Sequence, residues 1–223
     1  MVFLGNTLKT VDTIFLDLDG PLLDGAQRHY SCYRTIMEDA GFEPIASERY
    51  WQLKRDMINR RELLALSGAD VLYEQFLERW LSLIESPEAL ALDIVQPGAL
   101  ECLCNWKLQG KRMILVTLRK DAAALQAQLQ SKGLSSYLDD VLVCPHESGG
   151  AGKAQALLGL LGERPDPLRS VWVGDTEVDA QAARSLGLDV YLVENGLRSR
   201  SILERLDCTC VVESIVAFSA CID

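Results

Sequence analysis

Short apolar runs alternate with longer, helix-length segments through most of this chain. Each run is too short for a helix and is nearly free of polar residues, as expected for a strand with helices on both faces of its sheet. These runs lie at residues 14–16, 112–117 (RMILVT), 140–144 (DVLVC), 170–175 (SVWVGD), 189–193 (DVYLV) and 209–212. The alternation predicts an α/β fold: a doubly wound parallel sheet, Rossmann-like, with right-handed crossovers.

The segments between these runs predict helices. We expect helices at residues 98–109 and 121–132. A third begins near residue 153, a fourth follows SVWVGD and ends at Gly187, and a fifth covers residues 198–206. Each of the first two is followed by a glycine, which is a common stop signal for a helix.

Residues 26–95 follow a different pattern, with no convincing strand. A helix is expected from Ala26 to Ala40, a second from a Ser47 cap to about Leu66, and a third over residues 70–85. The sequence therefore predicts an all-helical insertion, the helical cap, at residues 23–95. Residues 1–22 and 96–223 would form the core.

Composition narrows the possible partners. The chain has 223 residues, 48% of them hydrophobic, and a formal net charge of -10. That is enough apolar material for a real core, and the negative field disfavours binding to nucleic acid or to an anionic membrane surface. We expect a small-molecule partner, and a monomer or homodimer.

The cysteines and the amino terminus indicate the compartment. Seven cysteines are scattered without a Cys-x-x-Cys pair, and two histidines do not complete a zinc spacing. Reduced thiols fit a cytoplasmic protein. No signal peptide is evident in the first ten residues, and no apolar run is long enough to span a bilayer.

Acidic residues follow two of the predicted strands. Asp17 and Asp19 end the first strand just before Gly20, and Asp175 and Asp179 lie in the motif GDTEVD. In a parallel sheet the carboxyl ends of the strands share one edge, where ligands bind. Alternatives from the residues alone are an ordinary Asp-Gly turn and a helix start enriched in acids.

A hydroxyl and a lysine join this edge. Thr117 is the last residue of the predicted RMILVT strand, and Lys153 opens the predicted helix after GGAG. A P-loop is excluded, since Glu147 stands at its first glycine and Ala154 follows the lysine. Carboxylates, one hydroxyl and one lysine suit Mg²⁺ and a phosphoryl group, although a solvated lysine is the alternative for Lys153.

DLDGPL, Thr117, Lys153 and GDTEVD together resemble, in order and arrangement, the haloacid dehalogenase-like hydrolases, over essentially the whole chain. The resemblance implies that Asp17 is the nucleophile, that Asp19 is the general acid and base, and that Lys153 neutralises charge. It also implies phosphate binding by Thr117 and the Leu118 amide. The implied Mg²⁺ ligands are Asp17, the Asp19 carbonyl, Asp175 and Asp179.

Two residues depart from the usual pattern of that family. Pro21 stands where threonine or valine is more frequent, and Leu118 replaces a small polar residue. Neither change removes a catalytic group. The acid at Asp19 favours phosphoryl chemistry over the carbon chemistry of the dehalogenases.

The cap carries a basic helix, RYWQLKRDMINRR. Lys54 and Arg61 project within or beside its apolar face, and we expect one of them to meet a second anionic group of the substrate. The alternative is that both reach water at the edge of that face. Arg28 and His29 are weaker candidates of the same kind.

The resemblance implies a Mg²⁺-dependent phosphatase that hydrolyses a small phosphorylated metabolite through an aspartyl-phosphate. A sugar-phosphate mutase similar to β-phosphoglucomutase is the main alternative, and a phosphonate hydrolase using Lys54 is a further variant. A non-catalytic binding member is disfavoured, because the strand-end set would then have no reason to remain together; this set is Asp17, Asp19, Thr117, Lys153 and Asp175.

Overall fold

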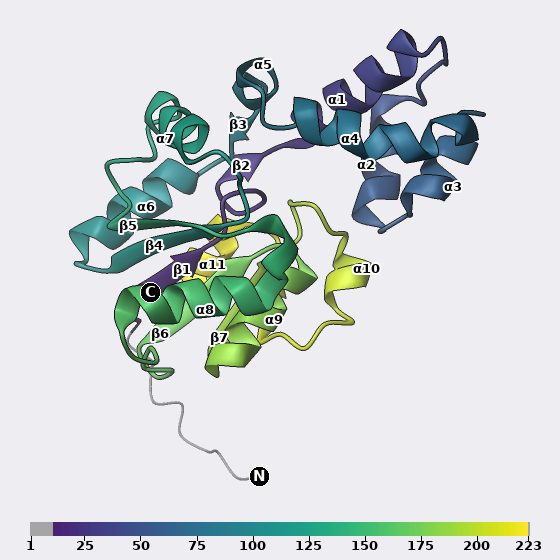
Figure 1. Cartoon of the computed structure of the whole chain (residues 1–223). Coiled ribbons are helices and arrows are strands. Elements are labelled where there is room, and N and C mark those ends of the chain that lie inside the picture. Colours follow the sequence, from purple (N-terminus) through teal and green to yellow (C-terminus); the bar gives the residue numbers. More distant parts are fainter. Residues whose placement is uncertain (1–10, 223) are drawn as a thin grey trace.

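The computed structural model describes residues 11–222, and a six-stranded parallel sheet lies at its centre (Figure 1). The strand order is β5-β4-β1-β6-β7-β8, so the two strands flanking β1 come from distant parts of the chain. The strands are β1 (Thr13–Leu16), β4 (Arg112–Thr117), β5 (Asp140–Val143), β6 (Ser170–Gly174), β7 (Asp189–Val193) and β8 (Cys210–Val212). The α/β fold predicted from the apolar runs is confirmed.

Helices cover both faces of the sheet. One face packs on α6 (Ala99–Leu108), α7 (Ala122–Ser131) and α11 (Ile215–Ile222). The other packs on α8 (Gly149–Leu161), α9 (Glu177–Leu186) and α10 (Arg200–Leu203), with the short η2 (His146–Ser148) before α8. Alternate side chains of each strand enter opposite faces: Ile14 and Leu16 join the first cluster and Phe15 the second. This double burial explains why the strand runs are apolar throughout.

The helical cap lies to one side of the sheet, beyond the carboxyl end of β1 (Figure 1). Its elements are α1 (Ala26–Asp39), α2 (Ser47–Arg55), α3 (Arg60–Ala65), η1 (Asp70–Leu72), α4 (Tyr73–Leu83) and α5 (Pro87–Ala91). It has a hydrophobic cluster of its own, in which Tyr33 stacks on Tyr50 with ring centroids 4.6 Å apart and packs near Phe76.

Two short strands connect the cap to the sheet. β2 (Leu23–Asp24) pairs antiparallel with β3 (Ile94–Val95), so the chain enters and leaves the cap side by side. The expectation of no strand in residues 26–95 was therefore wrong for Ile94–Val95, which is too short to show a period. The division at residues 22/23 and 95/96 remains a prediction, and it falls at this pair.

Some expected helices differ in extent. The single helix expected from Ser47 to Leu66 is broken in two, because Met57 adopts a left-handed φ of 61° and the Asn59 side chain caps the amide of Glu62. Ser47 is the first residue of α2 and not its cap. Helix α8 begins four residues before Lys153, and α5 and α11 were not expected.

The turn after β1 accommodates Pro21. The amides of Gly20, Leu22 and Leu23 all donate to backbone carbonyls within residues 18–23. Pro21 is buried among them. Because proline has no N–H, it leaves no buried donor without a partner here.

Within residues 11–222 no disulfide bond joins the cysteines, and three of the seven, Cys32, Cys102 and Cys144, are buried. Within residues 11–222, no helix is long and apolar enough to cross a membrane.

Candidate active site

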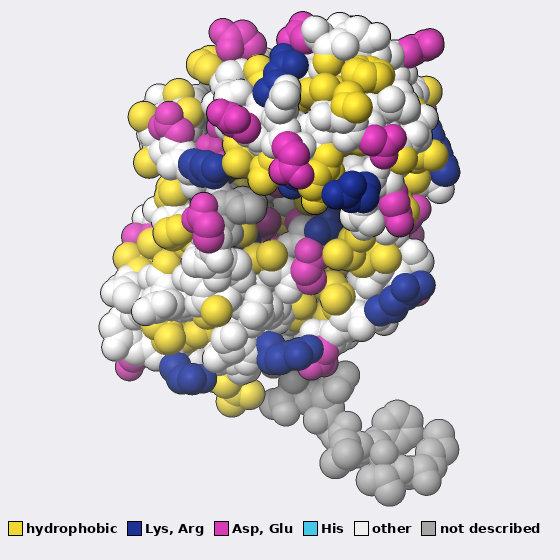
Figure 2. All heavy atoms as spheres, turned by 45° about the vertical axis from the view of Figure 1, so that its right-hand side comes forward, with side chains coloured by type: hydrophobic (Ala, Val, Ile, Leu, Met, Phe, Trp, Pro, Cys, Tyr) yellow, Lys and Arg dark blue, Asp and Glu magenta, His cyan; other side chains and the backbone are white. Residues whose placement is uncertain are grey.

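A cavity of about 390 Å³ lies between the cap and the carboxyl ends of the sheet strands. Its core wall includes Asp17, Thr117 and Lys153, and its cap wall includes Trp51 and Trp80. Figure 2 shows a hollow between the upper and lower parts of the molecule, with side chains of both charge signs around it. The topology thus brings the strand-end residues to one enclosed space.

Lys153 forms two ion pairs at the core side of the cavity. The ammonium of Lys153 lies 2.9 Å from a carboxylate oxygen of Asp17 and 2.9 Å from one of Asp179. Lys153 is 1% exposed and Asp179 is fully buried. The lysine is therefore a buried counter-ion, and the solvated alternative is excluded.

Asp179 is held from several sides. Besides Lys153, its Oδ1 accepts from the Trp172 indole at 3.2 Å, and its Oδ2 accepts from the hydroxyl and amide of Thr176 and the amide of Asp175. Asp179 is thereby tied to the start of α9, close to the end of β6.

Asp175 is packed tightly between two glycines. One of its oxygens accepts a hydrogen bond from the Leu197 amide, while Oδ1 is buried and has no hydrogen-bond partner. A Cβ added to Gly20 would lie 2.4 Å from the Asp175 carboxyl carbon, and one added to Gly196 would lie 2.2 Å from Oδ2. These close approaches require glycine at both positions and hold the Asp175 carboxylate in place.

Gly20→Ala is expected to lower activity at least tenfold, because its Cβ would displace the Asp175 carboxylate. Gly20 also has a φ of 93°, which costs any other residue about 1 kcal/mol. Gly41→Ala is the matched control, since Gly41 has a φ of 79° and open space around its Cβ position. Both variants should lose comparable backbone stability. Equal activity of the two purified variants would contradict the packing argument.

Burial and charge set the ionisation of this group. Burial is the main reason that the pKa of Asp17 rises to about 7, an effect that Lys153 opposes. Burial and the nearby Asp17 charge also raise the pKa of Asp175 well above 3.8. Burial alone would favour neutral Lys153, but the two aspartates outweigh it and raise its pKa, so the amine stays charged.

The carboxylates fit a divalent cation. Asp17, Asp175 and Asp179 each offer an oxygen within 4.8 Å of the others. A divalent cation bound here would pair with the unpartnered Oδ1 of Asp175 and would lower the raised pKa values of Asp17 and Asp175. Asp179 differs from the other two, since both its oxygens already accept hydrogen bonds.

Thr117 and Leu118 lie where the sequence placed them, at the end of β4 in the core wall of the cavity. Thr117 is 2% exposed. Lys153 reaches the same space from the second turn of α8, and not from its first residue as expected.

Asp19 is engaged by two arginines that sequence reasoning did not connect to it. Its carboxylate accepts from Arg28 Nη2 at 2.6 Å and from Arg119 Nη2 at 2.8 Å and Nε at 3.0 Å. Burial opposes ionisation of Asp19, but the charges of Arg119 and Arg28 outweigh it and lower its pKa. The side chain is held as a carboxylate between one arginine of α1 and one that follows β4.

Lys54 and Arg61 do not line this cavity. Lys54 Nζ lies 4.9 Å from the centre of the Trp80 ring, and the Arg61 guanidinium carbon lies 4.2 Å from that of Tyr73. Burial, chiefly, lowers the pKa of Lys54 to about 8. Their contact with substrate stays a prediction, whereas Arg28, Arg119 and Arg198 are in the cavity wall.

Comparison with known proteins agrees with this arrangement. A family model described as haloacid dehalogenase-like hydrolase matches residues 11–187. The chain is 27% identical over 220 residues to a phosphoglycolate phosphatase of Caulobacter vibrioides, covering 92% of this chain and 87% of the relative. It is 27% identical over 201 residues to a phosphoglycolate phosphatase of Synechococcus elongatus, covering 86% and 88%.

Solved structures share the fold. A crystal structure of a putative phosphatase from Clostridium difficile superposes with a TM-score of 0.77 at 17% identity, covering 96% of this chain and all of that one. A haloacid dehalogenase-like hydrolase from Streptococcus pneumoniae gives 0.76 at 15% identity, covering 95% and 98%.

The parallel sheet, the acids at its carboxyl edge and the family match define the class: the chain belongs to the haloacid dehalogenase-like hydrolases. Its relatives further assign it to the phosphatase branch of that family, so it is a phosphoric monoester hydrolase.

Proposed function

We propose that this chain is a Mg²⁺-dependent phosphatase that hydrolyses a small phosphorylated metabolite through an aspartyl-phosphate on Asp17. The observation that carries the proposal is the buried group in which Asp17 contacts Lys153 beside the unpaired Asp175 oxygen. A nucleophile, a fixed positive charge and free ligand capacity then share one cavity wall. The cytoplasmic location belongs to the same proposal.

In the first step the Asp17 carboxylate attacks phosphorus, an O–P bond forms, and the bond to the leaving oxygen breaks. Asp19 exchanges its arginine contacts for that oxygen, takes up a proton in doing so because its pKa is no longer lowered by the arginines, and donates that proton to the leaving oxygen. In the second step Asp19 removes a proton from water, which attacks phosphorus and releases Asp17. Thr117 and the Leu118 amide hold the phosphoryl oxygens, while Lys153 offsets their charge.

Asp17, the Asp19 carbonyl and Asp175 would hold the cation, with Asp179 as a further ligand or, given its occupied oxygens, as the support of Lys153 and Thr176. Bound Mg²⁺ supplies neutralisation of the carboxylates and of the transferring phosphoryl group.

The substrate class follows from the cavity and the relatives. A space of about 390 Å³ suits a small molecule, and the arginines in its wall, Arg28, Arg119 and Arg198, are each already paired with a carboxylate of the chain. The curated relatives named above are phosphoglycolate phosphatases. We therefore propose a small phosphorylated carboxylic acid, with 2-phosphoglycolate as the first candidate. A contact of Lys54 or Arg61 with the substrate remains part of the proposal.

Hydrolysis of p-nitrophenyl phosphate with and without Mg²⁺ tests the reaction, and a panel of phosphorylated acids and sugars tests the substrate class. We expect metal-dependent phosphate release without added bisphosphate cofactor. Release that required such a cofactor would indicate the mutase instead. A purified, folded chain without metal-dependent activity on any ester would contradict the proposal.

Mg²⁺ is also expected to stabilise the folded chain, and more at about pH 8 than at about pH 5.5. A carboxyl whose pKa is raised on folding contributes stability that is present below its unfolded value, near 3.8, and is lost as pH rises through the folded value, about 7 for Asp17. The melting temperature of the metal-free protein should therefore fall between about pH 5.5 and about pH 8, and Mg²⁺ should raise it again.

Thermal melts at both pH values, with EDTA or Mg²⁺, measure this effect. Asp175→Asn should reduce the Mg²⁺ increment strongly. Asp140→Asn, which alters an exposed pair with Arg112, should keep it. An increment equal at both pH values would count against a site built on Asp17 and Asp175.

A further inference from the structure

Two arginines and two aspartates form a compact charge cluster beside the catalytic cavity. Arg28 and Arg119 each contact both Asp19 and Asp93, so every member touches both members of opposite sign. Arg28 Nε lies 2.7 Å from Asp93 Oδ1, and Arg119 Nη2 lies 3.1 Å from Asp93 Oδ2. Positive and negative side chains therefore alternate around the cluster.

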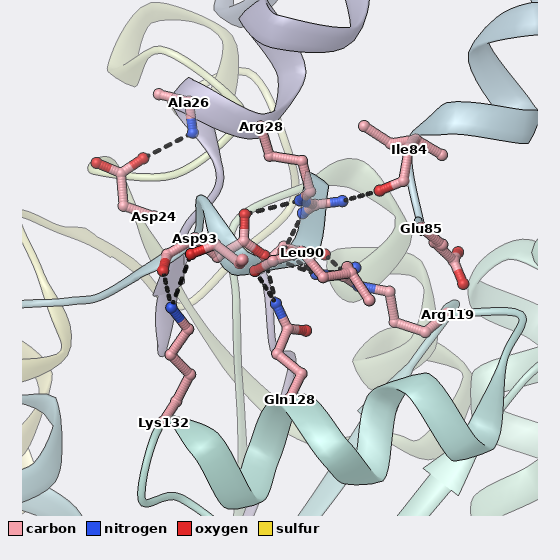
Figure 3. Close-up of polar contacts among 12 residues, drawn as sticks. Asp24, Ala26, Arg28, Ile84, Glu85, Leu90, Asp93, Arg119, Gln128 and Lys132 are labelled. Carbon is pink, nitrogen blue, oxygen red and sulfur yellow. Dashed lines mark hydrogen bonds and ion pairs between the residues drawn. The ribbon is translucent and has the colours of Figure 1, made fainter. Parts of the chain in front are cut away.

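Asp93 occupies the inner position of the cluster. Its side chain is fully buried, whereas that of Asp19 is 32% exposed, and Asp93 is not part of the cavity wall. Figure 3 shows Arg28, Arg119 and Gln128 converging on Asp93, with Gln128 reaching up from α7. Gln128 Nε2 donates to Asp93 Oδ2 at 2.8 Å, and Lys132 donates to the Asp93 carbonyl.

Asp93 also lies where the chain returns from α5 to β3. Arg28 comes from the first helix of the cap, and Arg119 follows the core strand β4. The cluster therefore joins the cap to the core around one buried carboxylate.

The count of charges determines how firmly Asp19 is held. Asp19 faces two guanidinium groups, and Asp93 offsets one of these two charges. Without Asp93, Asp19 alone would balance both arginines in a site with little solvent, where each uncompensated charge is costly. Asp19 would then stay against the arginines and would not turn toward the substrate.

We propose that Asp93 is a positioning residue for Asp19: by sharing Arg28 and Arg119, it leaves Asp19 free to exchange its arginine contacts for the leaving oxygen of the substrate. The inference rests on the proposed phosphatase reaction with Asp19 as proton donor. Asp93 touches neither substrate nor metal in this role and acts only through the two arginines.

The test is the dependence of kcat/KM on the leaving group. This parameter covers the step in which the leaving oxygen departs. An alkyl phosphate needs a proton at that oxygen, whereas p-nitrophenolate leaves without one. Asp93→Asn should lower kcat/KM for 2-phosphoglycolate and glycerol phosphate about tenfold to a hundredfold more than for p-nitrophenyl phosphate.

A paired variant separates positioning from support of the fold. The double variant Arg28→Gln/Asp93→Asn lacks one charge of each sign. Asp19 then faces Arg119 alone, so the net charge opposite it is +1, as in the parent. The ratio of alkyl to aryl rates should return toward that of the parent, even if both rates fall. Asp39→Asn is the matched control, because it removes the acid of an exposed arginine pair in the cap, and it should leave both rates unchanged.

An equal loss for alkyl and aryl esters in Asp93→Asn would overturn the inference, and so would an unrestored ratio in the paired variant. If Asp93→Asn does not fold, as judged by circular dichroism, the paired variant alone decides. Failure of that variant to fold would make Asp93 a residue of the fold only. A parent inactive on every ester would overturn the proposed function first, which distinguishes the two failures.

Discussion

Asp17→Asn is expected to lower phosphate release by at least about a thousandfold, the largest effect of any single change in this chain. An amide of the same size cannot form the phosphoryl ester, and nucleophile removal typically costs three or more powers of ten. Among residues 11–222, Asp17 is also the one carboxylate that touches Lys153 from within the cavity wall. Neither Asp179 nor Asp19 could replace it, because both Asp179 oxygens are engaged and Asp19 is held by arginines.

The measurement is steady-state release of phosphate from p-nitrophenyl phosphate with Mg²⁺. Asp12→Asn is a matched control, since Asp12 precedes β1 at the opposite end from Asp17 and pairs with Arg169. It should retain near-parental rates. A rate above about one tenth of the parental value in folded Asp17→Asn would contradict the nucleophile role.

Lys153→Met should lower both activity and stability. The lysine is 1% exposed and pairs with Asp17 and Asp179, so its loss leaves two buried carboxylates without their positive charge. Removing one partner of a buried ion pair costs about 3 to 5 kcal/mol of folding free energy. Activity should fall by a hundredfold or more, because no fixed charge then opposes that of the phosphoryl group.

Urea unfolding and steady-state kinetics measure the two effects. Lys107→Met is the control, because Lys107 pairs with Asp139 at 3.5 Å and both side chains are over one third exposed. Such a surface pair contributes about 0 to 1 kcal/mol. Equal destabilisation by the two substitutions would show that Lys153 is not the buried counter-ion of this site.

Local patterns predicted much of this chain because their physical basis is local. Strands buried on both faces must be apolar along their length, so RMILVT and SVWVG were visible as strands. Strand ends share one edge, so Asp17, Thr117 and Asp175 were expected to meet there, and they do. Two features could not be predicted in this way. A two-residue strand such as Ile94–Val95 is too short to show a hydrophobic period, and the helix break at Met57 depends on one backbone angle.

The partners of Asp19 were beyond local patterns. Arg28, Asp93 and Arg119 lie 65 and 26 residues apart along the chain, and each looks like an isolated charge. A single acid within the apolar stretch LALDIV was the only signal that Asp93 is buried. Lys54 and Arg61 were favoured instead, because a basic helix is visible in sequence while the direction of its side chains is not.

The sequence by itself determined the parallel sheet, the helical cap and the acids, threonine and lysine at one edge of the sheet, since these follow from hydrophobic period and strand ends. Only the tertiary structure decided which oxygens remain free. It assigned both oxygens of Asp179 to donors, left one oxygen of Asp175 unpaired, and placed Asp19 on two arginines. The reason is physical: the charge a buried carboxylate faces depends on groups within a few ångströms, and the chain brings these together from distant positions.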